Sequence, residues 1–384
     1  MSRLDELIAE LCPSGVKYVP LKQIAEVGTG SSDRVNAVDD GEYPFYVRSK
    51  NILRSNRYLF DEEAIIIPGE GGIGDIFHYV NGKYDLHQRA YRIHLIDPKV
   101  NTKFTYYCLS ANFKKFIIMK AVNATVTSIR KPMIENFQIP LPPLPVQQEI
   151  VRILDNFTEL TAELTAELTA ELTARRKQYE YYIDRVINAN NYQHIPLNDV
   201  AKVYDGTHQT PNYTESGVKF VSVENINDLY GTTKRISEVD FSKYKIKPQP
   251  GDVFMTRIGD VGTPAVVTTN EPIAYYVSLA LIRPNKELLP QYLYFYIKSS
   301  AFRKELYKRT LHTAVPIKIN KEDIGKCRVA VPPIKEQQRV IALLSRFDTL
   351  CNDISSGLPA EIEARQKQYE YYRDKLLSFK EVTS

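Results

Sequence analysis

The sequence predicts an α+β fold in which two similar mixed α/β domains are joined by an antiparallel two-helix coiled coil, with internal pseudo-two-fold symmetry. Three observations lead to this prediction. A helical segment occurs twice, 190 positions apart and without a gap. Each copy carries an apolar seam typical of helices that pair. A long stretch of short β-like runs precedes each copy. The expected parts are an N-terminal helix packed on the scaffold (1–19), a first domain (20–140), a helical spacer (141–190), a second domain (191–330) and a second helical spacer (331–384).

The repeat is clearest near the end of each helical segment. Ala174-Arg-Arg-Lys-Gln-Tyr-Glu-Tyr-Tyr-Ile-Asp184 is almost identical to Ala364-Arg-Gln-Lys-Gln-Tyr-Glu-Tyr-Tyr-Arg-Asp374. The same offset relates the pairs Pro142/Pro332, Gln147/Gln337, Phe157/Phe347 and Leu160/Leu350. A chain that repeats a helix so faithfully and varies what lies between the copies is built from two half-molecules on one scaffold.

Both copies carry apolar residues at alternating steps of four and three, the spacing of a helix that pairs with another helix. The matched seams are expected to pack on each other, and the long intervening segments allow them to run antiparallel. Two unrelated surface helices are the alternative, and the gap-free identity argues against it. The seam residues are Val146, Ile150, Ile153, Phe157, Leu160, Leu164, Leu168, Leu172, Tyr179, Tyr182 and Val186, and in the second copy Val340, Leu343, Phe347, Leu350, Ile354, Leu358, Ile362, Tyr369, Tyr372 and Leu376.

The first copy contains a repeated four-residue unit, Leu-Thr-Ala-Glu, within residues 158–174. Its residues favour helix, and each unit adds ~6 Å of length and turns the helix ~40° beyond one full turn. The predicted helix, Val146 to Asn188, is ~65 Å long at 1.5 Å per residue. In the second copy Gly357 and Pro359 are expected to break the helix, with Pro359 near the start of the next piece.

The two stretches between the helices are rich in short β-like runs and resemble each other. Each opens alike, at Pro20-Leu-Lys-Gln-Ile-Ala and Pro196-Leu-Asn-Asp-Val-Ala, and each closes with a strand that enters a proline-rich strap. Short helices are expected at Phe104–Lys120 and Pro290–Tyr307. The expected strands include 64–67, 91–96, 218–223, 253–255 and 265–267.

A glycine-rich segment, Gly69-Glu-Gly-Gly-Ile-Gly74, fits the G-x-G-x-x-G pattern of dinucleotide-binding proteins. That pattern must open a helix, whereas a β-hairpin with a turn at Asn81-Gly82 is expected here. A glycine-rich hairpin that lets the backbone approach a ligand is the better interpretation. A self-contained enzyme that binds a nucleotide or S-adenosylmethionine at this loop remains the alternative.

Composition and motifs favour a soluble binding protein over an enzyme. No apolar run approaches the ~20 residues that span a bilayer, and the first eleven residues carry acidic side chains that a signal peptide lacks. Four scattered cysteines predict neither a metal site nor disulfides and fit a cytoplasmic protein. A net charge of +4 permits nucleic-acid binding without indicating it. No catalytic motif occurs.

Together these features resemble the DNA-specificity (S) subunits of type I restriction–modification systems, over essentially the whole chain. The resemblance rests on the Pro-Leu-Pro-Pro-Leu-Pro-Val-Gln-Gln-Glu-Ile strap, the paired Lys-Gln-Tyr-Glu-Tyr-Tyr blocks and the Thr-Ala-Glu-Leu spacer. It also rests on Asp205-Gly-Thr-His-Gln-Thr-Pro211 and on the loop-strand Thr125-Val-Thr-Ser-Ile-Arg-Lys131.

The resemblance implies two target-recognition domains, each of which reads one half of a split, asymmetric site in double-stranded DNA. It implies a subunit with no catalysis and no cofactor of its own. The expected partners are two methyltransferase subunits, which bind S-adenosylmethionine and methylate adenine, and motor–nuclease restriction subunits.

Candidate DNA-binding residues are basic, amide or hydroxyl side chains in loops, since such groups contact phosphates and base edges. Any one of them could equally be a solvated surface group. In the first domain they are Arg34, Arg48, Lys50, Asn51, Gln88, Arg89, Arg130 and Lys131, and in the second Thr207, His208, Gln209, Asn225, Arg257, Lys318 and Lys321. The scaffold tyrosines, expected in the helix seam or at a methyltransferase interface, are Tyr179, Tyr181, Tyr182, Tyr369, Tyr371 and Tyr372.

The repeated unit also generates a mechanistic hypothesis. Two similar domains on a stiff helix can face the same side of a duplex only at certain separations. One unit rotates the helix by ~40°, close to the ~34–36° between neighbouring base pairs. The segment is therefore expected to set the gap between half-sites. A coiled-coil scaffold without nucleic acid is a third possibility, but it does not explain two long domains with different loops.

Overall fold

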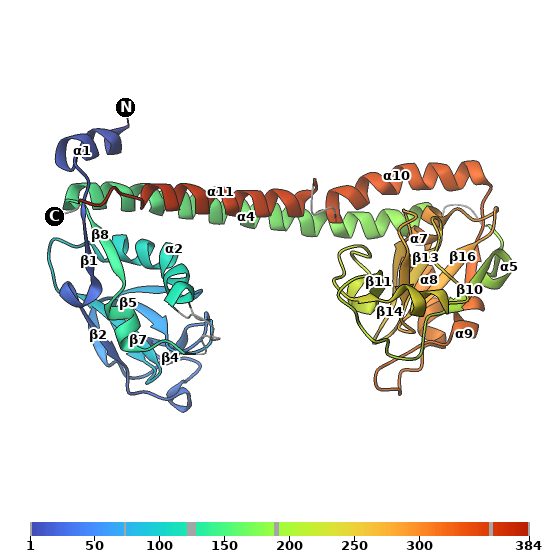
Figure 1. Ribbon diagram of the computed structural model, residues 1–384, viewed down its shortest axis with the longest axis horizontal. Helices are drawn as coiled ribbons and strands as arrows, with labels where there is room; N and C mark the ends of the chain where they lie inside the picture. Colours follow the sequence, from blue (N-terminus) through green and yellow to red (C-terminus); the bar gives the residue numbers. More distant parts are fainter. Residues whose placement is uncertain (1, 73, 121–127, 188–191, 353–355, 383–384) are drawn as a thin grey trace. The chain divides into compact units, whose positions relative to one another are not determined.

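A computed structural model of the chain describes residues 2–72, 74–120, 128–187, 192–352 and 356–382 (Figure 1). The chain divides into two compact units. Unit 1 comprises Met1–Glu167 and Ile362–Ser384, and unit 2 comprises Leu168–Glu361. Helix α4 (Leu144–Ile187) is continuous from unit 1 into unit 2, close to the predicted limits of 146 and 188.

Unit 1 is built on a six-stranded sheet with the strand order β2-β7-β5-β6-β3-β4, and a separate pair joins β1 to β8. All neighbours are antiparallel except β3 and β6, which are parallel. Its elements besides α4 are α1 (Arg3–Leu11), β1 (Lys17–Pro20), η1 (Leu21–Gln23), β2 (Ala25–Thr29), η2 (Arg34–Asn36), β3 (Tyr43–Tyr46), β4 (Leu53–Ser55), β5 (Phe60–Pro68), β6 (His78–Leu86), β7 (Ala90–Leu95), α2 (Thr102–Lys120), α3 (Lys131–Glu135), β8 (Gln138–Leu141) and most of α11 (Leu358–Leu376).

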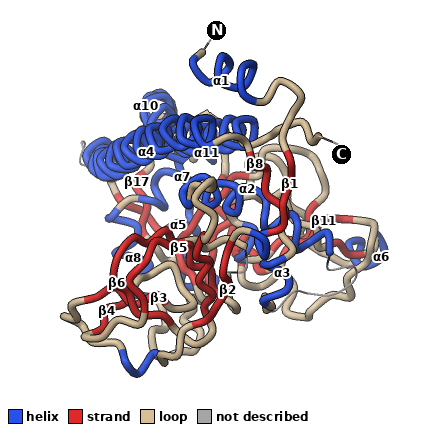
Figure 2. Tube along the Cα trace, turned by 90° about the vertical axis from the view of Figure 1, so that its left-hand side faces the viewer, coloured by secondary structure: helices blue, strands red, loops and turns tan. Residues whose placement is uncertain are grey.

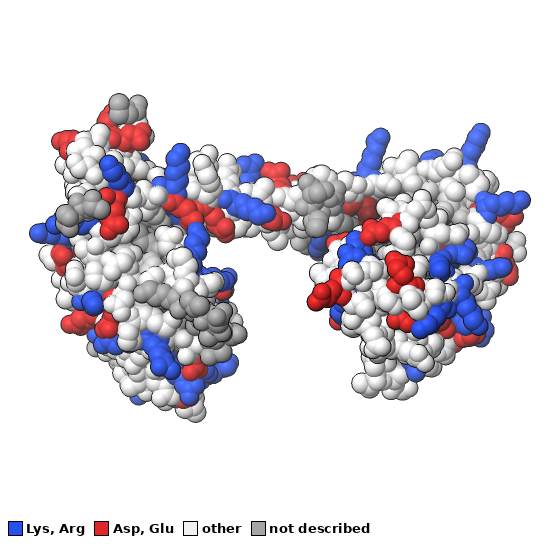
Figure 3. Space-filling model, viewed as in Figure 1, with Lys and Arg blue, Asp and Glu red and all other residues white. Residues whose placement is uncertain are grey.

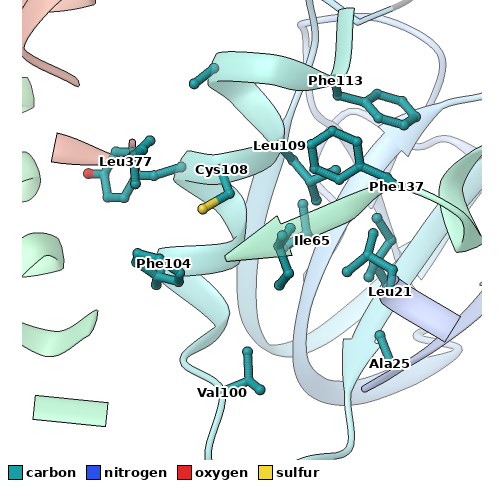
Figure 4. Close-up of a cluster of buried hydrophobic side chains, with 14 of the residues drawn as sticks. Leu21, Ala25, Ile65, Val100, Phe104, Cys108, Leu109, Phe113, Phe137 and Leu377 are labelled. Carbon is teal, nitrogen blue, oxygen red and sulfur yellow. The ribbon is translucent and has the colours of Figure 1, made fainter. Parts of the chain in front are cut away.

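Strand β5 is buried on both faces of this sheet. Ile65 and Ile67 belong to the core beneath α2, whereas Ala64 and Ile66 belong to a second cluster with Tyr84. Figure 4 shows Ile65 in the first core, with Phe104 and Cys108 of α2 nearby. Because α2 lies between the sheet and α4, as Figures 1 and 2 show, this core joins the strands to the helical part of unit 1.

Unit 2 repeats this plan with its sheet divided in two. The orders β10-β16-β13-β14 and β12-β11-β15 correspond to β2-β7-β5-β6 and β4-β3-β6 of unit 1, so β14 and β15 replace the single strand β6. Its elements are β9 (His194–Pro196), α5 (Leu197–Val200), β10 (Ala201–Asp205), β11 (Val218–Val221), η3 (Val223–Asn225), β12 (Arg235–Ile236), α6 (Glu238–Ser242), β13 (Val253–Ile258), β14 (Asp260–Val266), β15 (Ile273–Tyr275), β16 (Leu279–Pro284), α7 (Pro290–Lys298), α8 (Ser300–Arg309), α9 (Lys321–Gly325), β17 (Arg328–Ala330) and α10 (Ile334–Asn352).

Each proline strap is fixed to its domain by a buried glutamine. The Gln147 side-chain amide donates to the carbonyls of Pro142 (2.7 Å) and Lys99 (3.0 Å), and its Oε1 accepts from the Asn101 N–H (2.8 Å). Gln337, the equivalent residue, donates to the carbonyls of Pro332 (2.8 Å) and Glu287 (2.7 Å) and accepts from the Leu289 N–H (2.8 Å). These bonds satisfy backbone groups that burial would otherwise leave unpaired.

The predicted antiparallel pairing is confirmed within each unit. In unit 1, Phe157 of α4 packs on Tyr372 of α11 (6.2 Å between ring centroids), and the Thr158 hydroxyl lies 2.9 Å from that of Tyr369. In unit 2, Tyr182 of α4 packs on Phe347 of α10 (5.2 Å), and the Tyr179 hydroxyl donates to Asp348 (2.7 Å). Residue numbers rise along α4 while those of its partners fall.

These contacts also show the predicted pseudo-two-fold symmetry. Phe157 and Phe347 are repeat equivalents, and so are Tyr372 and Tyr182. Each unit therefore contains the same aromatic pair with the two repeat copies exchanged.

Three local predictions need correction. The segment 290–307 forms two helices, because Ser299 ends α7 and its side chain caps the start of α8. Asn81 and Gly82 lie inside β6, opposite Glu63 and Glu62, and do not form a turn. Val146 and Ile150 pack into the core of unit 1, so the first residues of the seam dock α4 on its domain.

The predicted break in the second helical copy is confirmed. Helix α10 ends at Asn352, and α11 begins at Leu358 with Pro359 as its second residue, where a missing N–H costs no helical hydrogen bond. The predicted boundary Asn188–Asn191 lies outside the described residues, although α4 ends immediately before it.

The glutamine anchor generates a stability prediction. We expect Gln337→Leu to lower the free energy of unfolding by about 2–4 kcal/mol, because it leaves the buried carbonyl of Pro332 and the part-buried backbone groups of Glu287 and Leu289 without partners. Urea unfolding followed by circular dichroism measures the change. The control Gln338→Leu alters the exposed neighbour in the same helical turn and should change stability little. Equal midpoints for both variants would contradict the proposed anchor.

Candidate nucleic-acid interface

In unit 1, several predicted DNA-binding residues lie at one edge of the sheet. Because β3 and β6 are parallel, the loops that follow them meet at the same edge, and the His87 N–H donates to the Tyr46 carbonyl (2.9 Å). Arg48 follows β3, and Gln88 and Arg89 follow β6. The carboxyl end of β5 reaches the same place through the pairing of Pro68 with Ala90.

Glu70 holds two of these arginines together. Its carboxylate accepts from Arg48 (2.9 Å) and Arg89 (3.0 Å). The hydrogen bond from Arg89, together with that from Arg48, holds the pKa of the Glu70 carboxyl below its ordinary value. Both guanidinium groups remain largely exposed, so one carboxylate positions two cations that can still meet a polyanion.

The remaining candidates of unit 1 are all exposed, and some border this cluster. Gln88 donates to Asp33 (2.8 Å), next to Arg34. The Ile129 N–H donates to the Gly69 carbonyl (2.7 Å), which places Arg130 beside the cluster, while Lys131 pairs with Glu135 (3.6 Å). Lys50, next to Asn51, lines a separate pocket with Asp75 and Arg373. Thr125–Thr127, part of the predicted loop-strand, lie outside the described residues.

The equivalent edge of unit 2 is organised by Asp205. The Thr207 N–H donates to the Tyr275 carbonyl (3.1 Å), so the loop after β10 lies beside the end of β15. Asp205 forms ion pairs with Arg257 and Lys321 (3.6 Å), and the exposed His208 lies 4.0 Å away. This edge therefore also surrounds an acidic residue with basic groups.

Two candidates of unit 2 have roles inside the protein. Arg257 is buried, and its Nε donates to the Ile319 carbonyl (3.0 Å) while its Nη1 binds Asp205. It thus fixes two loops and does not present its guanidinium at the surface. Asn225 is half-buried, and its Oδ1 accepts from the Ser222 N–H (3.1 Å) to cap a turn. Gln209 and Lys318 are exposed.

A groove of about 640 Å³ opens between the loop after β10 and the segment after α6. Thr207, Gln209 and Lys321 line it, and so do Lys243, Tyr244 and Lys245, which our sequence analysis did not propose. The run Lys243-Tyr-Lys-Ile-Lys247 is a signal that could have revealed them, because lysines that flank an aromatic side chain are typical of nucleic-acid surfaces.

Figure 3 shows where charged side chains gather on the visible face of each unit. In unit 1, lysine and arginine gather at the lower end, remote from α4. In unit 2 they form a cluster on the visible face, with acidic side chains between them.

The six scaffold tyrosines divide into two groups. Tyr179, Tyr182, Tyr369 and Tyr372 contact the opposing helix in the seam of their unit. Tyr181 and Tyr371 occupy equivalent positions but point outward, with 58% and 62% of their surface exposed. The hydrophobic seam therefore accounts for four of them and leaves two available to a partner.

The structure does not support a dinucleotide site at the glycine-rich segment. The described residues of this segment, Gly69–Gly72 and Gly74, lie between β5 and β6, whereas the dinucleotide motif must open a helix. Positive φ angles at Gly71, Gly72 and Gly74 (70°, 58° and 71°) explain why glycine occupies these positions.

Within the described stretches, no helix has the length and apolarity needed to cross a bilayer. Nor do three or more His, Cys, Asp or Glu side chains of those stretches converge as a metal site would require. All four cysteines are buried and unpaired.

With the fold and its charged edges established, comparison with known proteins identifies the family. The model of the type I restriction modification DNA specificity domain matches residues 13–174 and 190–364. The chain belongs to this family, which confirms the resemblance drawn from its sequence.

The curated relatives carry matching names. A putative type I restriction enzyme specificity subunit of Haemophilus influenzae is 31% identical over 386 residues, covering 95% of this chain and 96% of the relative. The EcoR124I/EcoR124II specificity subunit of Escherichia coli is 32% identical over 305 residues, covering 74% and 72%. These names confirm the class of specificity subunits and leave the enzyme alternative without support.

Solved structures confirm the fold. A chain from a study of complex assembly and conformational transition in a type I restriction–modification system aligns with a TM-score of 0.67 at 16% identity, over 95% of this chain and 98% of that chain. The HsdS subunit from Thermoanaerobacter tengcongensis aligns with a TM-score of 0.52 at 16% identity, over 95% and 97%.

The assignment of Arg257 to an internal role generates a prediction. We expect Asp205→Asn to destabilise unit 2 by about 2–4 kcal/mol, because a buried guanidinium loses its carboxylate while the 20% exposure of Asp205 moderates the cost. Urea unfolding measures the change. Glu224→Gln, which breaks the exposed 3.0 Å pair with Lys234, is the control and should cost less than about 1 kcal/mol. If Asp205→Asn lowers the free energy of unfolding as little as the control does, the internal role of Arg257 is contradicted and Arg257 is again a candidate for DNA binding.

Proposed function

We propose that this chain is the non-catalytic subunit that reads DNA sequence for a type I restriction–modification complex. The observation that supports this most strongly is the duplication of one plan. The two units share a strand order, and one edge of each carries basic side chains and a glutamine. Equivalent glutamines, Gln147 and Gln337, anchor each unit to the helical scaffold. Because the chain belongs to the DNA specificity family, we propose DNA as the ligand of these edges.

The two edges suit a bipartite, asymmetric site. The exposed side chains of Arg48, Arg89 and Gln88 at the edge of unit 1 can contact phosphates and the major-groove edges of bases, where guanine and adenine offer bidentate acceptor and donor patterns. Unit 2 instead presents lysines, a glutamine and two tyrosines around its groove. Because the side chains differ, the two half-sites should differ in sequence.

The continuous helix α4 is proposed to set the gap between the half-sites. The Leu-Thr-Ala-Glu units lie within its 44 residues, and α4 is helical throughout them. A whole unit can be added or removed without a change in the helix-forming character of the segment. Its ~6 Å length and ~40° residual rotation would then change the separation and phase of the two reading edges.

Two methyltransferase subunits, carrying S-adenosylmethionine, and restriction motor–nuclease subunits are the proposed partners. Tyr181 and Tyr371 support a two-fold interface, because equivalent aromatic residues are exposed at equivalent helical positions. Exposed tyrosine combines a large apolar ring with a polar hydroxyl, which suits protein interfaces. We propose a cytoplasmic complex, where such a system meets DNA.

Methylation mapping tests the function directly. We expect genomic DNA methylated by the assembled complex to carry modified adenines in one split motif, with two different half-sites and a gap of constant length. Long-read sequencing of methylated and unmethylated DNA locates the modified bases. A continuous motif, or methylation without sequence preference, would refute the proposal.

Deletion of one repeat unit tests the role of α4. Removing Thr161–Leu164 should shorten the mapped gap by about one or two base pairs, because a unit contributes ~6 Å and ~40° while a base pair contributes ~3.4 Å and ~35°. Both half-site sequences should persist. Glu163→Gln, an exposed change in the same unit that keeps its length, is the control. An unchanged gap in the deletion variant would contradict this role.

A further inference from the structure

The loop between α8 and α9 in unit 2 is firmly held at its base. The Leu311 N–H donates to the Lys318 carbonyl (2.7 Å), which closes the loop on itself. The Gly259 N–H donates to the Ile317 carbonyl (2.8 Å), and the Ile319 N–H donates to the Arg257 carbonyl (3.0 Å). Residues 311–317 are thus attached through three backbone hydrogen bonds, two of which lead to β13 and the turn that follows it.

The tip of this loop is apolar and exposed. Val315 has 99% of its surface exposed, Pro316 beside it is also exposed, and Leu311 and Ile317 are 42% and 36% exposed. Figure 1 shows the loop projecting, in orange, from the end of unit 2 remote from α10. Figure 3 shows this projection covered mainly by uncharged atoms. A well-anchored apolar projection of this kind indicates a contact site, because none of the described residues of unit 2 covers it.

The surroundings of the loop favour a polyanion as the partner. Lys318 is at its base, and the exposed Lys308 and the half-buried Lys321 flank it in the neighbouring helices α8 and α9, where they also pair with Glu305 (3.2 Å) and Asp205 (3.6 Å). The same base is tied to Arg257, which holds Asp205 at the candidate DNA-binding edge. An apolar tip with a cationic base matches duplex DNA, whose phosphates surround stacked, apolar base faces.

We propose that the loop 311–317 acts as a wedge that inserts Val315 and Pro316 into the minor groove of the half-site read by unit 2, where it partly unstacks one base step. This inference rests on the proposed function. Apolar side chains, including proline, serve as such wedges in proteins that kink DNA, and the bent duplex then contacts more protein surface. A base step that unstacks easily would be preferred at this position without a hydrogen bond to either base.

The test compares two exposed valines of unit 2 in the full chain, assembled with its methyltransferase subunits. Val315→Ser removes the apolar tip, while Val239→Ser changes a valine on α6 that is 68% exposed and lies outside the loop. Both side chains are exposed, so neither variant should alter folding, which thermal unfolding verifies. The probe is a duplex with the site found by methylation mapping, with 2-aminopurine replacing adenine at single positions of either half-site.

We expect Val315→Ser to weaken duplex binding by about tenfold. Without the apolar tip the base step stays stacked, so the duplex does not bend and its additional contacts with the protein are lost. The 2-aminopurine fluorescence that rises on binding of the unaltered complex, at one position of the unit 2 half-site, should fall to the level of free duplex. The dependence of affinity on salt should keep its slope, because valine neutralises no phosphate. Val239→Ser should match the unaltered complex in all three measurements.

The outcomes separate the inference from the proposed function. If the unaltered complex binds the duplex and Val315→Ser binds equally, with the same fluorescence, the wedge is refuted and the function stands. If Val315→Ser instead fails to assemble with the methyltransferase subunits, the loop is a protein contact and the wedge is also refuted. If the unaltered complex shows no preference for the mapped site, the proposed function itself fails.

Discussion

The structure depends on one interaction, the packing of α4 against two partner helices through an aromatic pair that occurs twice. Phe157 with Tyr372 and Tyr182 with Phe347 are the same contact with the repeat copies exchanged. Next to this aromatic pair, Thr158 contacts Tyr369 in unit 1. The repeat equivalent of Thr158 is Asp348, which binds Tyr179 and also Lys298 (2.8 Å) in unit 2.

Burial would raise the pKa of the Asp348 carboxyl, but the Lys298 ammonium and two tyrosine hydroxyls bring it below its ordinary value. The Asp348 carboxylate therefore stays ionised at neutral pH, and its contacts with Lys298 and Tyr179 hold the helix register in unit 2.

From this seam, a chain of contacts leads to the reading edge within each unit. The helix is docked on its domain by apolar residues at its start and by the buried glutamine that ties the strap to a neighbouring loop. The strap continues from a strand, β8 or β17, and the core under α2 or α7 links this region to the sheet. The edge loops are then fixed by parallel strand pairs and by one acidic residue, Glu70 or Asp205, that gathers basic groups. Recognition side chains can differ freely because the framework that positions them is mostly backbone and core.

Much of the fold could be predicted because the duplication and the helical periodicity can be recognised in the sequence without knowledge of long-range contacts. The seam spacing predicted that the two helical copies pair, and the long segments between them allowed the antiparallel direction. Gly357 and Pro359 predicted the break between α10 and α11. The site was harder, because a surface cation and a buried, ion-paired cation look alike in sequence. Arg257 was predicted to bind DNA, but it is buried with Asp205, and this internal role depends on a contact 52 residues away along the chain. Asn81-Gly82 has the composition of a tight turn, yet Glu62 and Glu63 pair with it across the sheet. Long-range pairing overrode the local preference in both cases.

The most direct measurement of the central claim is chemical cross-linking of engineered thiols across the helix seam. The four native cysteines are buried, so a short bis-maleimide added to the folded protein reacts with introduced cysteines at accessible positions. The pair Thr158→Cys with Tyr369→Cys should give an intramolecular product rapidly, and so should Tyr182→Cys with Phe347→Cys, because these side chains meet in the structure. The control pair Ala162→Cys with Tyr371→Cys, on outward positions, should react only slowly. Equal yields for the control, or no product for either seam pair, would contradict the antiparallel arrangement on which the account depends.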